Sequence, residues 1–381
     1  AFHADETAPA TSNHIVHLVP SPDQSDILTY HKADVPEPSG PTMDLTATNI
    51  VIATGAKPRP LPGNPFAGAL IDSTQALEVN EFPSSAVIIG AGAIALEFAS
   101  MWNAAGSKVT LLIRKDRVLS AWDRRAGTTL TRELKRHGVN IITRASVTHV
   151  DTGANLGATV HYTCEGQDGE QSVWGEIALV AIGRDPITDP AWGVTIDDHG
   201  HVATDAYGRT DKPGVWAVGD VTAGHALAHR AFEQGIVIAE TIAGLNPKPV
   251  DEATVPQIVF SFPEAASVGL TVEQAQARED LIEIKETNYP MLANARMLMS
   301  GTAGSLTIVS GCDAANPDTP RVLGVHMVSQ MASDIIAEAE QLVGNHVPLA
   351  DAARLVHPHP TFSETLGEAL LKADGRPLHT R

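Results

Sequence analysis

The sequence predicts an α/β protein that begins with parallel βαβ structure and ends in an antiparallel α+β domain, and three observations carry this prediction. Residues 86–113, "AVIIGAGAIALEFASMWNAAGSKVTLLI", have the pattern of an apolar strand, a glycine turn, a helix and a second apolar strand, which is a βαβ unit. Two similar strand ends, "IVIATGAKP" at 50–58 and "ALVAIGRDP" at 178–186, indicate two related folds in one chain. Beyond Pro256, apolar stretches alternate like antiparallel strands.

The other elements follow from apolar runs bounded by Gly, Pro, Asn and Asp. Further strands are expected within 14–60, where the last is buried, and at 139–151, 158–166, 177–186 and 214–221, with the middle ones forming a meander inserted into the parallel set. Further helices are expected at 124–136, from near His225, at 333–343 and at 348–356. A chain of 381 residues is long enough for two to three domains, and the composition shift places one boundary near 255.

The composition limits the classes of partner. A net charge of −19 without a cluster of Lys and Arg argues against nucleic acid and anionic membrane surfaces, and favours small molecules. No uninterrupted apolar run reaches the roughly 18 residues of a membrane helix, and no signal peptide is recognisable. The only cysteines, Cys164 and Cys312, are far apart, which is typical of a reducing cytosol. We therefore expect a cytoplasmic protein, and because residue 1 is Ala rather than Met, a piece of a longer chain.

The glycine turn predicts a binding site for a dinucleotide. Gly90, Gly92 and Ala95 form G-x-G-x-x-A between a strand and a helix. Such glycines permit a tight turn and a close approach of backbone amides to a pyrophosphate, which rests on the helix N-terminus. The alternative is a purely structural turn, which the complete strand, turn, helix and strand context disfavours.

The end of the second strand bears on the choice of coenzyme. An acid about 20 residues after the glycines binds the ribose 2′-hydroxyl of NAD, but Ile113 stands there. Arg114 and Lys115 follow and could receive the 2′-phosphate of NADP. Alternatively these cations are solvated surface charges beside Asp116 and Arg117, and the sequence favours the phosphate contact only slightly.

Two further segments carry candidate functional residues. Gly219 and Asp220 end an apolar strand, where the carboxylate could accept hydrogen bonds from ribityl or ribose hydroxyls, or could cap the next turn. In "HPHPTFSE", residues 357–364, a histidine and Glu364 could be a base and its orienting carboxylate. The same residues could form a capping box over "TFSE", which the residues alone favour, or a metal site of His357, His359 and Glu364, for which no fourth ligand stands nearby. We therefore expect no metal.

The order of the motifs resembles one family. The segments "IVIATG", "GAGAIALE", "ALVAIGRDP", "GVWAVGDV", "ALAHRA" and "HPHPTFSE" occur in this order and together are similar to the flavin-dependent pyridine nucleotide-disulfide oxidoreductases. The end of the chain is most similar to the dihydrolipoamide dehydrogenases of that family. The resemblance implies two Rossmann-like domains, the first incomplete, that bind FAD and NAD(P), followed by a dimerisation domain with an antiparallel sheet. The implied boundaries are 1–72 and 197–254 for the FAD-binding segments, 73–196 for the NAD(P)-binding domain and 255–381 for the dimerisation domain.

The resemblance also implies roles for individual residues. His359 would be the catalytic base, oriented by Glu364 and reaching into the other subunit of a homodimer. The FAD would be held by Ala53, Thr54, Gly55, Gly219, Asp220, Ala226, Leu227, Ala228 and His229. The nicotinamide cofactor would be NAD, with NADP as the alternative that Arg114 and Lys115 allow. It would contact Gly90, Ala91, Gly92, Ala93, Ile94, Ala95, Leu96, Glu97, Ile113, Arg114 and Gly183. The substrate would be a dithiol such as a lipoyl group, on a carrier domain of a 2-oxoacid dehydrogenase complex, and a base is needed because only the thiolate attacks a disulfide.

Two departures from the family lead to further expectations. Family members open with another glycine-rich βαβ unit, a C-x-x-x-x-C redox pair and a lysine just beyond it, none of which occurs in these 381 residues. We therefore expect this chain alone to bind FAD poorly and not to perform the full reaction, with Cys164 in the meander and Cys312 in a loop as unpaired thiols.

"LLIRKDRVL" is more similar to the NADPH-using glutathione reductases, although Ser120 stands where they would supply a second arginine. The alternatives are thus an NADPH-dependent disulfide reductase or a non-catalytic nucleotide-binding and dimerising module.

Overall fold

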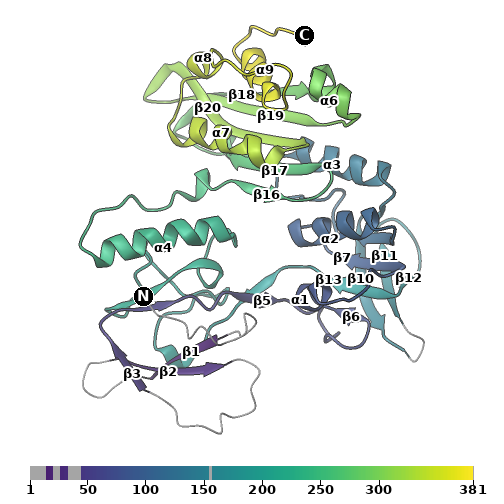
Figure 1. Cartoon of the computed structure of the whole chain (residues 1–381), viewed down its shortest axis with the longest axis vertical. Helices are drawn as coiled ribbons and strands as arrows, with labels where there is room; N and C mark the ends of the chain where they lie inside the picture. The colour runs from purple at the N-terminus through teal and green to yellow at the C-terminus, as the bar shows by residue number, and fades with distance from the viewer. Residues whose placement is uncertain (1–13, 20–25, 33–43, 154–156, 381) are drawn as a thin grey trace. The chain divides into compact units, whose positions relative to one another are not determined.

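The computed structural model describes residues 14–19, 26–32, 44–153 and 157–380 (Figure 1). The chain forms two compact units: the first combines Ala1–Lys57 with Arg184–Glu252, and the second combines Pro58–Gly183 with Ala253–Arg381. Two short strands, β5 (Ala56–Pro58) and β14 (Arg184–Pro186), pair with each other. Within the part of the chain that the structure describes, none of the helices has the length and apolarity needed to cross a bilayer.

The first unit contains small sheets and one long helix. Its antiparallel sheet has the order β1-β2-β3, formed by His14–Val19, Asp26–Lys32 and Asp44–Ala47, and its parallel pair joins β4 (Ile50–Ile52) to β15 (Val215–Ala217). Ile50 and Ile52 point into a core that β15 completes, so the predicted buried strand is confirmed. The long helix α4 spans Ala228–Ile242. It begins later than the predicted His225 because Leu227 still has extended backbone. Short 3₁₀ turns at Pro190–Trp192 and Gly219–Val221 complete the unit, and a third, Glu252–Thr254, spans its end at Glu252.

The second unit contains a five-stranded parallel sheet with the order β6-β13-β7-β8-β9. These strands span Leu70–Ile71, Ile177–Val180, Ser85–Ile89, Lys108–Leu112 and Asn140–Ile142. Helices α1 (Ser73–Leu77), α2 (Ala93–Ala104) and α3 (Arg124–Arg136) belong to the same region. The βαβ unit and the helix at 124–136 are confirmed. Trp102 of α2 is fully buried against the sheet.

A three-stranded antiparallel meander, β10-β11-β12, joins the parallel sheet (Figure 1). Its strands span Ala145–Asp151, Ala158–Cys164 and Gln171–Gly175. Its apolar side packs on Val87, Leu112 and Val180 of the parallel strands. The predicted meander is confirmed, and Cys164 lies in it as an unpaired thiol.

The last part of the second unit is a five-stranded antiparallel sheet with the order β16-β17-β20-β19-β18. The strands span Gln257–Val259, Glu264–Gly269, Asn316–Ser329, Ser305–Asp313 and Leu281–Pro290. Its helices are α5 (Val272–Gln276), α6 (Ala295–Ser300), α7 (Ala332–Gly344), α8 (Leu349–Ala352) and α9 (Glu364–Ala373), with a 3₁₀ turn at Met291–Ala293. Helices α7, α8 and α9 share one core with the sheet. The predicted α/β fold class with a final antiparallel domain is confirmed.

Two sequence predictions in this region are wrong. The helix predicted at 348–356 is only α8, Leu349–Ala352. Cys312 does not lie in a loop: it is a fully buried residue of β19 with no disulfide partner. The reason is that β19 and β20 form a long hairpin whose pairing continues to Asp313 and Asn316, so the strand extends through the polar residues that resembled a loop.

Candidate functional site

The glycine turn has the geometry of an anion cradle. Gly90 has φ +144°, and a Cβ there would lie 2.1 Å from the Ala181 carbonyl oxygen, so only glycine fits. The same Cβ would lie 3.4 Å from the Cβ of Ala95, which is fully buried. Gly92 is the residue before α2, and a Cβ there would meet nothing within 4 Å. The turn thus leaves open space in front of the N–H groups of the first turn of α2, where an anion is stabilised.

The residues predicted to follow this turn lie on the first turns of α2. Ala91, Ala93 and Ile94 are partly buried, whereas the side chains of Ala95 and Leu96 lie in the core. The Glu97 carboxylate accepts a hydrogen bond from the Phe260 N–H at 3.0 Å. Any contact of Ala95 or Leu96 with a cofactor must therefore come from the backbone.

A cavity of about 630 Å³ opens at the cradle. Its lining contains three cationic side chains and no carboxylate. It is formed by Arg59, Leu61, Pro62, Ile89, Gly90, Ala91, Gly92, Leu112, Arg114, Lys115, Ser120, Ala145, Ser146, Val147, Ala181, Ile182 and Gly183. Sequence reasoning missed Arg59 and residues 145–147, which come from a loop and from the meander.

The candidate residues that follow β8 differ in where their side chains lie. Ile113 is 1 % exposed and its side chain packs in the core. Its backbone is also satisfied, because its N–H donates to Ile142 and its carbonyl accepts from Ala145. Arg114 and Lys115 are exposed and line the cavity, and neither makes an ion pair with another described residue. Asp116, the nearest acid in sequence, instead pairs with Arg117 at 3.3 Å and Arg124 at 3.8 Å.

The first unit brings two of the predicted FAD-binding segments together. The parallel strands β4 and β15 end at the same edge, where the Val218 N–H donates to the Ile52 carbonyl oxygen at 3.0 Å. Ala53, Thr54 and Gly55 follow one strand, and Gly219 and Asp220 follow the other. The Thr54 hydroxyl donates to the Ile187 carbonyl oxygen at 2.6 Å.

The Asp220 carboxylate is free for a ligand. It makes no hydrogen bond or ion pair within the described ranges, so it does not cap the next turn. The loop beside it is held by Arg230, which is 3 % exposed and donates to Glu252 Oε1 at 2.5 Å and to the Ala223 carbonyl oxygen. A carboxylate presented from a fixed loop, with no internal donor, fits recognition of ligand hydroxyl groups.

The predicted residues at 226–229 form the start of α4. Leu227 is the N-terminal cap and contributes no side-chain hydrogen bond. Ala226, Ala228 and His229 are exposed. The N-terminal end of this helix is therefore accessible, and it carries the partial positive charge of the helix dipole. These residues, with the free Asp220, fit a ligand that has hydroxyl groups and acquires negative charge.

The histidine and glutamate pair predicted within residues 357–364 is formed. His359 Nδ1 lies 2.7 Å from Glu364 Oε1, with side chains 65 % and 15 % exposed. A carboxylate only accepts hydrogen bonds, so Nδ1 carries the proton. His359 Nε2 makes no contact with another described polar group. The capping box is only half present, because the Glu364 N–H donates to the Thr361 hydroxyl at 3.3 Å but the Glu364 carboxylate turns to His359.

The neighbouring histidine has another partner. His357 Nε2 lies 2.9 Å from Glu338 Oε1 on α7, and this hydrogen bond raises the pKa of His357. His357 therefore does not join His359 and Glu364, which contradicts the three-residue metal site considered from the sequence. Its ring packs against Gly367, where a Cβ would lie 2.3 Å from Nδ1.

A second cavity, of about 290 Å³, adjoins the His359 pair. It is lined by Tyr289, Ala293, Asn294, Ala295, His359, Glu364, Glu368 and His379. The Tyr289 hydroxyl and Glu364 Oε2 are buried without a hydrogen-bond partner. Burial, and then the charges of Glu368 and Glu364, raise the pKa of Tyr289. The histidine therefore stands at the mouth of a pocket whose buried groups stay able to bind a ligand or water.

A parallel sheet with a glycine turn before its helix, followed by an antiparallel domain, is the fold of the flavoprotein disulfide reductases, a class of nucleotide-binding oxidoreductases. The chain belongs to the pyridine nucleotide-disulphide oxidoreductase family: the family's model matches residues 15–235, and the model of its dimerisation domain matches residues 255–370. The resemblance inferred from the sequence is confirmed.

Individual proteins of known name are also similar to this chain. The chain is 38% identical over 341 residues to the dihydrolipoyl dehydrogenase of Cupriavidus necator, covering 88% of this chain and 70% of the relative. A crystal structure of LpdA from Mycobacterium tuberculosis superposes with a TM-score of 0.81 at 26% identity, covering 94% of this chain and 76% of that one. The HOCl-induced flavoprotein disulfide reductase RclA from Escherichia coli gives a TM-score of 0.77 at 26% identity, over 90% and 76% of the two chains.

Proposed function

We propose that this chain provides the coenzyme-binding and base functions of a dihydrolipoyl dehydrogenase, which oxidises a dihydrolipoyl dithiol to the disulfide and reduces a pyridine nucleotide. The names of its relatives support the reaction, and the contact of His359 with Glu364 carries the assignment of the base. We assign FAD binding to residues 1–72 and 197–254. We assign pyridine-nucleotide binding to residues 73–196 and dimerisation to residues 255–381. The grouping of Ala1–Lys57 with Arg184–Glu252 in one unit supports a single FAD domain built from two segments.

His359 has the arrangement of a general base. With its proton on Nδ1 facing Glu364, its lone pair is on Nε2, which can take a proton from a substrate thiol. The resulting thiolate is the nucleophile in thiol–disulfide exchange. Glu364 then faces an imidazolium, whose charge it stabilises. The pocket beside the pair would admit the dithiol.

The flavin would be held by Ala53–Gly55, Gly219, Asp220 and the start of α4 at 226–229. Asp220 would accept hydrogen bonds from its hydroxyl groups, and the helix terminus would stabilise negative charge on it. When bound, FAD supplies electron transfer between the dithiol and the nicotinamide.

The cysteines of this chain do not supply a redox disulfide. Cys164 and Cys312 lie in different sheets and are both buried. Burial, with Glu283 adding to it, also raises the pKa of Cys312, and a buried thiol with a raised pKa is a poor nucleophile. We therefore expect the purified 381-residue chain not to oxidise dihydrolipoamide.

For the coenzyme we propose NADP(H) in preference to NAD(H). The supporting observation is the cavity lining: Arg114 and Lys115 lack acidic partners, and no carboxylate is present to receive a ribose 2′-hydroxyl. A 2′-phosphate beside these cations would form charge-assisted hydrogen bonds. The names of the relatives, dihydrolipoyl dehydrogenases, support the reaction but do not state the coenzyme. The preference for NADP(H) therefore rests on the cavity lining.

Titration of the purified chain with NADPH and NADH, followed by coenzyme fluorescence, tests the coenzyme proposal. We expect NADPH to bind at least tenfold tighter, because one hydrogen bond between charged groups contributes about 1.5–3 kcal/mol. Arg114→Ala should remove most of that preference and leave NADH binding unchanged. Arg124→Ala is the matched control, since Arg124 is an exposed arginine of the same region that pairs with Asp116 and does not line the cavity. Tighter binding of NADH would make the chain NAD-dependent, and no binding of either coenzyme would contradict the assignment of the cavity.

A further inference from the structure

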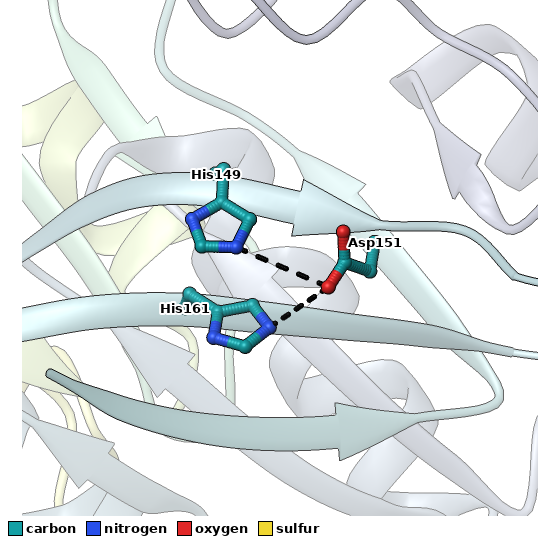
Figure 2. A group of neighbouring side chains, drawn as sticks. All are labelled: His149, Asp151 and His161. Carbon is teal, nitrogen blue, oxygen red and sulfur yellow. Dashed lines mark hydrogen bonds and ion pairs between the residues drawn. The ribbon is translucent and has the colours of Figure 1, made fainter.

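The meander gathers two histidines and two carboxylates that do not line the coenzyme cavity. His149 and Asp151 belong to β10, His161 belongs to β11, and Glu170 immediately precedes β12. His149 and His161 are direct cross-strand partners. Because His149 is opposite His161 and side chains alternate along a strand, His149 and Asp151 face the same side of the meander as His161 (Figure 2).

The two imidazoles stack, and each carboxylate faces one edge of the stack. The ring centroids are 4.0 Å apart and the ring planes differ by 9°. On one edge, Asp151 Oδ2 lies 3.1 Å from His161 Nε2 and 3.9 Å from His149 Nε2, as Figure 2 shows. On the other edge, Glu170 Oε1 lies 3.8 Å from His149 Nδ1 and Glu170 Oε2 lies 3.7 Å from His161 Nδ1. The Thr148 hydroxyl donates to Glu170 at 2.7 Å and fixes that carboxylate.

The two Nε2 atoms face Asp151 from neighbouring strands, and the two Nδ1 atoms face Glu170 on the opposite edge. A neutral imidazole with its hydrogen on Nδ1 presents the lone pair of Nε2. A divalent cation on the Asp151 edge would therefore be bound by two Nε2 lone pairs and Asp151 Oδ2, with Glu170 on the side of the Nδ1–H groups.

We propose that His149, His161 and Asp151 bind a divalent transition-metal ion such as Zn²⁺, with Glu170 holding the two histidines from behind. Two imidazoles and one carboxylate suit zinc, nickel or copper better than magnesium or calcium, which prefer oxygen ligands throughout. A carboxylate on the far nitrogen of a metal-bound histidine fixes its orientation and increases its basicity. The charges of the two carboxylates balance the charge of the ion.

The distances are compatible with binding after a small adjustment. The three ligand atoms lie within 4.8 Å of one another, and a tetrahedral zinc site with bonds of about 2.0–2.1 Å requires them to approach further. The His149 side chain is 46 % exposed and Asp151 is 66 % exposed, so both can tilt toward the ion. Three protein ligands leave a fourth position for water. In neutral His161 the hydrogen must be on Nδ1 when the ion is bound, so that the lone pair of Nε2 faces the metal.

Isothermal titration of the EDTA-treated chain with Zn²⁺ tests the proposal. We expect one saturable site per chain with a micromolar or tighter dissociation constant. His149→Gln and Asp151→Asn should each weaken binding at least tenfold. Glu170→Gln should weaken it by about 10–100-fold without removing a ligand. Excess Mg²⁺ should not compete.

His201→Gln is the matched control, because His201 is also paired with an aspartate, Asp197 at 3.3 Å, in a different part of the chain. It should bind zinc like the wild type. Circular dichroism of each variant separates loss of the site from loss of the fold. Absence of saturable binding in the folded wild type, or wild-type affinity in folded His149→Gln, would overturn the proposal. Neither result bears on NADPH binding, so the coenzyme assignment is tested separately.

Discussion

The His359 imidazole has one nitrogen engaged by Glu364 and the other free, and this asymmetry is the basis of its proposed role. We predict that neutral His359 holds its proton on Nδ1, and that Glu364→Ala removes this preference. An exposed contact of this kind contributes at most about 1 kcal/mol, so the expected excess of the Nδ1–H tautomer is roughly fivefold. Nitrogen-15 NMR of the labelled chain distinguishes the two tautomers.

Glu338→Ala is the matched control for this measurement. Glu338 contacts the other histidine of the segment, His357 at 2.9 Å, and does not contact His359. Its removal should change the signals of His357 and leave the tautomer of His359 as it was. If Glu364→Ala left the His359 tautomer unchanged, Glu364 would not be the orienting residue.

Residue types could be predicted better than side-chain directions. The sequence pointed to His359 and Glu364 as a pair, but the same letters also fitted a capping box, and only the fold shows that the carboxylate turns away from the Thr361 backbone. The sequence named both Ile113 and Arg114 as candidates after β8, yet the Ile113 side chain is buried in the core and Arg114 lines the cavity. Which of two adjacent side chains faces a cavity depends on the packing around them, which the sequence pattern does not report.

Helix α9 carries Glu364 and packs on His357 through a glycine. We predict that Gly367→Ala destabilises the protein by about 1–2 kcal/mol, although alanine favours a helix over glycine by about 1 kcal/mol. The added Cβ would lie 2.3 Å from His357 Nδ1 and 2.8 Å from Cε1, and relieving such overlap in a packed site typically costs 1–3 kcal/mol or more. Urea denaturation followed by circular dichroism measures the change.

Gly344→Ala provides the comparison within the same unit. Gly344 ends helix α7, and the nearest atom to an added Cβ is Glu340 Oε1 at 3.4 Å, so this substitution should be neutral or slightly stabilising. In a His357→Ala background, Gly367→Ala should no longer destabilise. A persistent loss in that background would show that the steric conflict is not with His357.

Elements with a strong periodic pattern were predictable, and those whose ends depend on tertiary pairing were not. The bounds of the helix at 124–136 agree with the sequence because Asp123 caps its start and the last turn carries Lys135 and Arg136. The end of the strand through Cys312 was missed because Gly311, Asp313 and the residues after them resemble a loop and continue the strand only by pairing with β18 and β20. Local sequence does not report those partners.

At the scale of the whole molecule, the order of motifs predicted the fold class because each motif fixes a strand end and the following turn. The cluster on the meander was not predictable in this way. His149 and His161 stand on two neighbouring strands and Glu170 immediately precedes a third, and the pairing register decides which of their residues lie side by side. Since one residue of slip reverses the face, composition and spacing contain no signal for such a site.

The surface of the segment matched by the dimerisation model leads to the last prediction. Large apolar side chains are exposed there: Phe260, Phe262, Ile282, Leu292, Leu298, Met299, Met331, Leu355 and Val356. Because the dimerisation model matches this segment and exposed apolar side chains are suited to burial at an interface, we expect the chain to elute at twice its 40.1 kDa mass in size-exclusion chromatography with light scattering. Leu298→Asp with Met299→Asp, both on α6, should shift it toward the monomer because buried unpaired charges are costly. Leu77→Asp, equally exposed but outside the matched segment, should remain dimeric, and a monomeric wild type at micromolar concentration would contradict the prediction.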